Sequence, residues 1–268
     1  MLDLLLFTTD VSLAGQALAG GASAIVVDWE RIGKEQRQTG ADTLVSQDTV
    51  EDLARIGRGV AAPVICRLDG LGRWSDEQVE LALELGADEI LLPMIRSPAE
   101  VERGLALAGG RCGVGIMLET LDALACAEEL GRLPLSRVYV GLQDLAIERG
   151  SPSLFTALAD GTVESVRGSF GDIPFGFAGP GVPDPEADSG LPVPPRLLLG
   201  ELARLRADFT TLRRAFWRYV EGRDVAQAIT TIRRAVRDAE ARDAESVARD
   251  RAALIAAVDD WAPAGQSR

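Results

Sequence analysis

The chain alternates between short, continuous apolar runs and longer segments in which apolar residues recur every three or four positions. Continuous runs of about four to eight apolar residues are typical of parallel strands that are buried on both faces. Eight such runs occur, at positions 2–8, 24–29, 63–68, 89–94, 112–118, 137–141, 173–177 and about 207–212. The pattern therefore predicts eight parallel strands.

The segments between these runs carry the periodicity and the end signals of helices. Clear examples cover residues 76–85, 98–108, 121–130 and 195–206. The Ser97-Pro98 pair stands where a helix should begin, and Gly86 and Gly109 stand where helices should end. Eight strands with helices between most of them favour a closed (β/α)8 TIM barrel over an open sheet. The length of 268 residues suits this fold, which typically takes about 250.

Two long connections and the C-terminal segment depart from this rhythm. Residues 31–50 are polar, and residues 179–195 are rich in Pro, Gly and Asp. Both would lie at the C-terminal face of the barrel, where barrel active sites form. We expect a barrel core over residues 1–212 and a helical extension over residues 213–268. The extension is predicted to be one long helix to about Trp261, packed on the barrel or on a neighbouring subunit.

The composition narrows the classes of partner. The net charge of −13 makes the chain a poor nucleic-acid binder, because phosphate contacts need clustered Lys and Arg, and anionic membrane surfaces would repel it. No apolar run reaches transmembrane length, and no basic stretch precedes the first apolar run as in a signal peptide. We therefore expect a cytoplasmic protein with no nucleic-acid or membrane partner.

Histidine is absent and cysteine is scarce, which limits the possible chemistry. Without histidine, a Ser-His-Asp triad, a Cys-His dyad and a His-based zinc site are excluded. Acid–base work would fall to carboxylates, Lys, Tyr, Arg, a bound water or the substrate. The cysteines Cys66, Cys112 and Cys126 form no CxxC pair, and the first two lie in apolar runs, so we expect buried, reduced thiols there.

Carboxylates gather at the predicted C-terminal ends of four strands, where residues point to the active site of a barrel. These strand ends carry Asp28 and Glu30 (second strand), Arg67 and Asp69 (third), Glu119 (fifth) and Asp144 (sixth). Burying so many carboxylates together is unfavourable unless a cation neutralises them. A hard ion such as Mg²⁺ suits two carboxylates with waters and substrate oxygens, and it acts as a Lewis acid on a carbonyl.

Each of these residues also has a structural interpretation. Asp144 could cap a helix that begins near Leu145, and Glu119 could stabilise the start of the next helix through the helix dipole. Arg67 could be a structural ion-pair partner of Asp69 or Asp28, and Asp28 and Glu30 could bind loop backbone. Taken singly, none of them favours the metal site over these alternatives. Taken together on adjacent strand ends, they do.

Four segments also carry a resemblance to known proteins. They are Ala24-Ile-Val-Val-Asp-Trp-Glu30, Leu91-Leu-Pro-Met94, Gly115-Ile-Met-Leu-Glu-Thr120 and Val140-Gly-Leu-Gln-Asp-Leu-Ala146. In this order, over roughly residues 1–180, they resemble the HpcH/HpaI aldolase and citrate lyase beta-subunit family of the phosphoenolpyruvate/pyruvate barrel superfamily. The resemblance implies that Glu119 and Asp144 bind Mg²⁺, Mn²⁺ or Co²⁺, and that Arg67 stabilises negative charge on the substrate oxygen. The implied reaction is reversible C–C bond cleavage.

The chain departs from this family where the aldolases have their acid–base residue. HpaI-like aldolases have Asp-Gly-Glu-His where this chain runs from Asp28 to Arg31, so Arg31 replaces the histidine. The citrate lyase branch has Asp-Leu-Glu-Asp there, and Asp28 and Glu30 fit either branch. Met117 stands where many aldolases have a polar residue, and Gln143 replaces a small residue or an acid. We expect catalytic roles for Arg67, Glu30 and Asp28, with Glu30 or a metal-bound water as base, and substrate binding by Arg67, Gln143, Arg31 and Met117.

The expected substrate is a small, pyruvate-like 2-oxo acid or an acyl-CoA, in which case coenzyme A enters as part of the substrate. Acyl-CoA use predicts a basic patch for the nucleotide phosphates. Its candidates are Arg31, Lys34, Arg37 and Arg73, which a solvated basic loop explains equally well. Relatives in the family assemble as trimers or hexamers, which implies a homo-oligomer.

Two alternative functions stay open. The same enolate site would also serve condensation, thioester hydrolysis or decarboxylation. A non-catalytic scaffold paralogue, its base lost with the histidine, would keep the fold without the reaction.

Overall fold

Eight parallel strands close into a barrel in which each strand pairs with the next and β8 pairs with β1. A computed structural model describes residues 2–32, 46–73, 75–187, 191–212 and 214–261. The strands are β1 (Asp3–Phe7), β2 (Ala24–Asp28), β3 (Val64–Arg67), β4 (Glu89–Leu92), β5 (Gly113–Leu118), β6 (Arg137–Val140), β7 (Phe175–Ala178) and β8 (Phe209–Leu212). The predicted (β/α)8 barrel followed by a C-terminal helix is confirmed.

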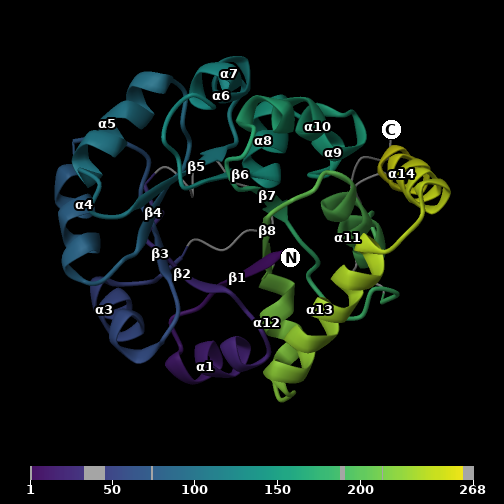
Figure 1. The fold of residues 1–268 in the computed structure, drawn as a ribbon, viewed down its shortest axis with the longest axis horizontal. Coiled ribbons are helices and arrows are strands. Elements are labelled where there is room, and N and C mark those ends of the chain that lie inside the picture. The colour runs from purple at the N-terminus through teal and green to yellow at the C-terminus, as the bar shows by residue number, and fades with distance from the viewer. Residues whose placement is uncertain (1, 33–45, 74, 188–190, 213, 262–268) are drawn as a thin grey trace.

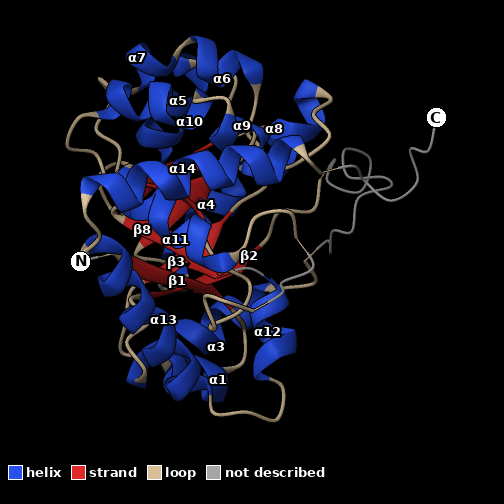
Figure 2. Ribbon diagram, turned by 90° about the vertical axis from the view of Figure 1, so that its right-hand side faces the viewer, coloured by secondary structure: helices blue, strands red, loops and turns tan. Residues whose placement is uncertain are grey.

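Helices form a ring around the barrel, which Figure 1 shows along the barrel and Figure 2 from the side. They are α1 (Val11–Ala19), α3 (Val50–Gly59), α4 (Ser75–Glu84), α5 (Pro98–Ala108), α6 (Leu121–Ala125), α7 (Ala127–Leu130), α8 (Leu142–Arg149), α9 (Thr156–Ala159), α10 (Thr162–Arg167), the 3-10 helix η1 (Gly168–Phe170), α11 (Pro195–Arg204), α12 (Arg214–Val220), α13 (Val225–Glu240) and α14 (Ala244–Asp259). The predicted signals act as expected in α5, where Ser97 caps the first turn and Gly109 ends the helix with a φ of 58°.

The inside of the barrel is filled and closed at its N-terminal end. Apolar and aromatic side chains occupy the interior, namely Leu5, Ala24, Val26, Ile65, Leu91, Met117, Tyr139 and Phe209. Below them Arg137 donates to both carboxylate oxygens of Glu89, at 2.5 and 2.7 Å, and its guanidinium lies 4.9 Å from the centre of the Phe209 ring. Substrate access is therefore left to the opposite, C-terminal mouth.

The segment after residue 212 differs from its prediction as one long helix. It forms the three helices α12, α13 and α14, because Gly222 turns the chain with a φ of 68° and Asp243 caps a new helix. Helix α13 lies between α11 and α1 in the ring, and α14 lies outside α11, next to α9 (Figure 1). Among the described helices, none combines the length and the apolar character that crossing a membrane would need.

Two smaller expectations are also corrected. The helix predicted over residues 121–130 is divided into α6 and α7 at Cys126, whose backbone leaves the helical region. Cys66 is buried in β3, where burial raises the pKa of its thiol, but Cys112, directly before β5, is only half-buried. All three cysteines are free thiols.

Candidate active site

Five charged side chains predicted to be functional lie together at the C-terminal mouth of the barrel. Asp28 ends β2, Arg67 ends β3 and Glu119 directly follows β5. Glu30 lies just beyond β2, and Asp144 lies in the first turn of α8. Each of the five is 9 % exposed or less. Parallel strands bring residues that are far apart in sequence to the same end of the barrel, which explains the convergence.

Arg67 is a buried cation whose position is fixed from several sides. Its Nε and Nη2 atoms donate to the two carboxylate oxygens of Asp28, at 2.8 and 2.5 Å. Its Nη1 atom lies 3.2 Å from Glu30 Oε2 and 3.8 Å from the Met117 sulfur, and the Phe7 ring centre lies 5.2 Å from the guanidinium. Burial alone would lower the pKa of Arg67, but the charges of Asp28 and Glu30 raise it well above its usual value. The side chain is therefore a permanent positive charge with a defined direction.

Glu119 is a buried carboxylate whose acidity is strongly reduced by its surroundings. Burial, followed by the negative charges of Glu30 and Asp144, raises its pKa to about 8. Arg67 opposes this shift, as does the Met94 amide, which donates to Glu119 Oε1 at 2.8 Å. At neutral pH the metal-free carboxyl group is therefore largely protonated, and a cation that binds there must displace its proton.

The raised pKa predicts how the stability of the metal-free protein changes with pH. The folded state holds its proton on Glu119 up to about pH 8, whereas the unfolded chain releases it near the ordinary value of 4.5. Stability contributed by this group is therefore greatest at acidic pH and falls between these two values, by up to about 1.4 kcal/mol per pH unit. We expect urea denaturation in a metal chelator to show a steeper decline for the wild type than for Glu119→Gln. Equal slopes for the two proteins would contradict the assignment.

The donors present suit a small, hard divalent cation. Four acidic side chains, those of Asp28, Glu30, Glu119 and Asp144, lie in this part of the mouth together with the cation Arg67, so acidic groups outnumber basic ones among these five residues. Among the described residues no group of three or more Cys, Asp or Glu is arranged to hold an ion. Glu119 and Asp144, whose charges act on each other, could supply two carboxylate ligands, with water and substrate in the remaining positions, as Mg²⁺ commonly requires.

The segment that carries Glu30 is held by two aspartates outside the site. Asp48 accepts the amide of Asp28 at 2.9 Å, and Asp69 Oδ1 accepts the amides of Arg31 and Ile32, each at 2.7 Å. Of the two structural partners considered for Arg67, the structure confirms Asp28 and not Asp69, which is engaged with loop backbone. Asp28 Oδ1 also accepts the Glu30 amide at 3.1 Å, so the alternative that Asp28 binds loop backbone is confirmed as well. Asp69 serves as an anchor of the loop that follows β2.

The segment after β6 also corrects its prediction. The strand ends at Val140 and α8 begins at Leu142, so Gln143 and Asp144 lie in the first turn of a helix and not at a strand end. The alternative that Asp144 caps a helix starting near Leu145 is wrong as well, since Gly141 is the capping residue and no side chain caps this helix. Gln143 is half-buried beside the more deeply buried Asp144.

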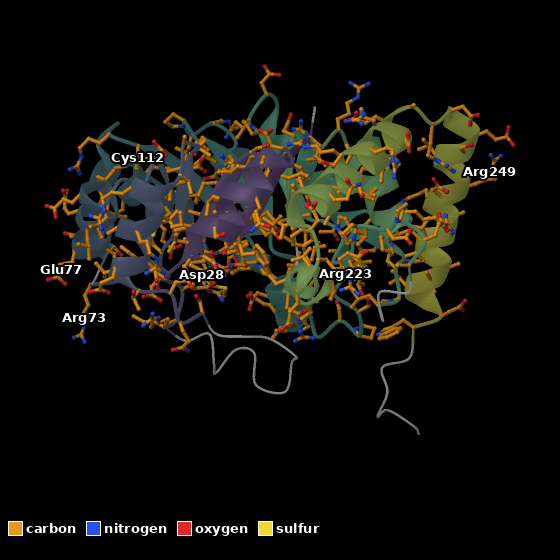
Figure 3. All side chains as sticks on the ribbon, turned by 90° about the horizontal axis from the view of Figure 1, so that it is seen from below. Asp28, Arg73, Glu77, Cys112, Arg223 and Arg249 are labelled. Atoms are coloured by element: carbon orange, nitrogen blue, oxygen red, sulfur yellow. The ribbon has the colours of Figure 1, made fainter. Side chains whose placement is uncertain are left out.

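The basic residues considered for nucleotide phosphates are not gathered in the described part of the chain. The exposed Arg31 donates to the backbone carbonyl of Asp48, and Arg73 points outward at the periphery (Figure 3). Lys34 and Arg37 lie outside the described residues. Arg31 also lines a cavity of about 950 Å³ whose charged lining residues are otherwise acidic, namely Asp48, Glu51, Asp69, Asp76, Glu77, Glu80 and Glu84. Such a surface repels phosphate groups.

Sequence reasoning missed three residues that shape this site. The Met94 amide holds Glu119, the Phe7 ring covers Arg67, and Gly141 leaves the space that Glu119 occupies. Met94 and Gly141 both stand in the segments that carry the family resemblance. Their position one or two residues beyond a strand was the available signal. Their roles depend on backbone direction, which residue types alone do not specify.

Comparison with known proteins supports the fold. The sequence matches no family model, and no curated protein matches it either. The structure is similar to that of the citrate synthase SbnG, with a TM-score of 0.57 and 14 % sequence identity over 82 % of this chain and 90 % of that chain. At this identity the likeness shows a shared barrel fold.

Proposed function

We propose that this protein is a divalent-metal-dependent carbon–carbon lyase that cleaves a hydroxylated 2-oxo acid through an enolate, as an aldolase does. The observation that carries the proposal is that a buried Arg67, fixed by Asp28, lies at the open end of the barrel with the acidic residues Glu119 and Asp144. The family resemblance of the motifs around these residues supports the same reaction. The structurally similar protein is named as a citrate synthase, and condensation at this site is therefore the alternative reaction.

The reaction requires stabilisation of the negative charge that develops on the keto oxygen. A base removes the proton of the C4 hydroxyl group, the C3–C4 bond breaks, and its electron pair passes into the 2-oxo group while the aldehyde leaves. The protonated base then returns its proton to C3 of the resulting enolate, which restores the base and gives the shorter 2-oxo acid. An ion held by Glu119 and Asp144 would supply Lewis acidity. Arg67, already fixed by Asp28, adds a guanidinium charge without reorganisation during the reaction.

Glu30 is the residue of this chain that we propose as the base. Its carboxylate is 1 % exposed, and one oxygen lies 3.2 Å from Arg67 Nη1. That position puts a proton acceptor beside the cation that would bind the keto oxygen. In a chain without histidine, a buried carboxylate is a suitable group for this role.

A free 2-oxo acid fits the surroundings better than an acyl-CoA. The acidic cavity beside Arg31 would repel the phosphates of coenzyme A, and Arg73 points away from the molecule. A small acid needs only the positive groups at the centre of the mouth.

The test of the proposed function does not require the aldehyde to be known. Pyruvate is incubated with the protein and Mg²⁺ or Mn²⁺ in D2O, and deuterium in its methyl group is followed by NMR. Exchange that depends on both protein and metal is expected, since protonation of the enolate at C3 is reversible. Exchange with acetyl-CoA but not with pyruvate would favour the thioester alternative. Absence of exchange with either would favour the scaffold.

Glu30→Gln is expected to slow this exchange by about 10²–10⁴-fold, because it removes the base while keeping the shape of the side chain. Mn²⁺ affinity should change little. Glu80→Gln, which alters an exposed carboxylate paired with Arg111, is the matched control and should exchange as the wild type does. Exchange at the wild-type rate in Glu30→Gln would remove Glu30 from the mechanism.

A further inference from the structure

Met94 has a backbone conformation that its residue type disfavours. Its φ is +55°, and Arg206 is the other non-glycine residue with positive φ in the described part of the chain. Left-handed backbone is uncommon for residues with a side chain, and where it persists the surrounding structure must impose it. Met94 lies at the mouth of the barrel, two positions beyond β4. Contacts at the site should therefore explain why Met94 keeps a positive φ.

That conformation directs the Met94 amide at a candidate metal ligand. The N–H group donates to Glu119 Oε1 at 2.8 Å, across the neighbouring strand end. Glu119 is itself 1 % exposed, so this bond acts in a dry environment where its direction matters. One oxygen of the carboxylate is thereby oriented by backbone.

Gly141 determines the place of the other oxygen. A Cβ atom at this position would lie 2.2 Å from Glu119 Oε2 and 2.8 Å from Glu119 Cβ. Any side chain there would collide with the carboxylate. Glu119 can adopt its position only because residue 141 has no side chain, and Asp144 follows in the next turn of the chain.

We infer that Met94 and Gly141 are positioning residues that orient the Glu119 carboxylate, with Oε1 held by the Met94 amide and Oε2 presented to the ion. This inference rests on the proposed function for the ion and concerns parts of the chain that need not touch it. Both devices act through backbone, since Met94 contributes its N–H group and Gly141 contributes the absence of Cβ. The Met94 side chain, which is half-buried, is not needed for this role.

The contrast between two substitutions at residue 94 separates this role from side-chain packing. Met94→Gly removes the side chain but keeps the N–H group and permits positive φ. Met94→Ile keeps most of the volume, but its β-branched side chain strongly disfavours the left-handed region. If positioning is the role, Met94→Gly keeps Mn²⁺ affinity and Met94→Ile loses it. If packing is the role, the order is reversed.

Mn²⁺ affinity of the folded variants is measured by calorimetry, with circular dichroism and thermal melting to verify folding. We expect Met94→Ile and Gly141→Ala to bind at least about tenfold more weakly than the wild type, as for other groups that orient metal ligands. Met94→Gly should stay within about threefold, well inside the loss typical of such groups. The control is Gly168→Ala, where φ is −61° and a Cβ meets nothing within 4 Å. Wild-type affinity in Met94→Ile, or equal losses in Met94→Gly and Met94→Ile, overturns the inference.

Amide hydrogen exchange in the absence of metal keeps this inference separate from the proposed function. The Met94 amide should exchange slowly in the wild type and rapidly in Glu119→Ala, which lacks the acceptor. Rapid exchange in the wild type overturns the inference whatever the metal does. Slow exchange of the Met94 amide combined with no Mn²⁺ binding by the wild type overturns the metal-dependent function and the role of Oε2. In that case Met94 would only hold Glu119 in place.

Discussion

Replacement of Arg67 by methionine should strongly slow pyruvate methyl exchange and also destabilise the fold. Methionine fills much of the same space without a charge, so the enolate loses a fixed donor, which typically costs about 10²–10³-fold in rate. The buried Asp28 and Glu30 lose their common partner. Removing one partner of a buried ion pair costs about 3–5 kcal/mol. Urea denaturation and the NMR exchange assay measure the two effects independently.

The double variant Arg67→Met/Asp28→Asn distinguishes the catalytic role of Arg67 from its structural one. Neutralising Asp28 removes the unpaired charge, so we expect much of the lost stability to return while exchange stays slow. Arg103→Met, which breaks an exposed pair with Asp76, is the matched control and should change the free energy of unfolding by no more than about 1 kcal/mol. Recovery of exchange in the double variant would show that Arg67 is only structural.

Glu119→Gln should weaken Mn²⁺ binding by more than about 100-fold, beyond the 10–100-fold that loss of a supporting residue typically costs. The amide keeps the shape and can still accept the Met94 N–H group, but it carries no charge for the ion. The substitution also removes a buried acid whose ionisation is opposed by Glu30 and Asp144, so the free energy of unfolding at neutral pH should hold or rise. Weaker metal binding in a protein that is no less stable is the expected combination.

Calorimetry in buffers of different ionisation enthalpy adds a second test of Glu119. Because its pKa is raised to about 8, binding of Mn²⁺ near pH 7 should release close to one proton, and this release should vanish in Glu119→Gln and at pH values well above 8. Glu80→Gln serves again as the control on an exposed carboxylate. Unchanged affinity in Glu119→Gln would place the ion elsewhere or exclude it.

For the acid–base group, residue types alone identify a candidate but do not reveal its contacts. The absence of histidine excluded the usual carriers and directed attention to Glu30 from the sequence alone. That Glu30 Oε2 lies beside Arg67, and that Asp69 holds the loop behind it, depends on contacts between separate strands. Asp28 and Asp69 look alike as acids at or just beyond strand ends, yet of the two Asp28 contacts Arg67 and Asp69 binds loop amides. Residue type does not distinguish them because it does not specify which neighbour each side chain contacts.

The sequence by itself determined the barrel, because eight buried apolar runs separated by helical segments have few other compact arrangements. It also placed Asp28, Arg67 and Glu119 at strand ends, because a parallel barrel collects those ends at one mouth. Only the tertiary structure decided which side chains these residues contact. The register that sets Asp28 opposite Arg67 puts both side chains on the inner face, and a shift by one residue would turn either away. The left-handed turn at Met94 and the clearance at Gly141 likewise arise from how neighbouring strands meet, which no local pattern encodes.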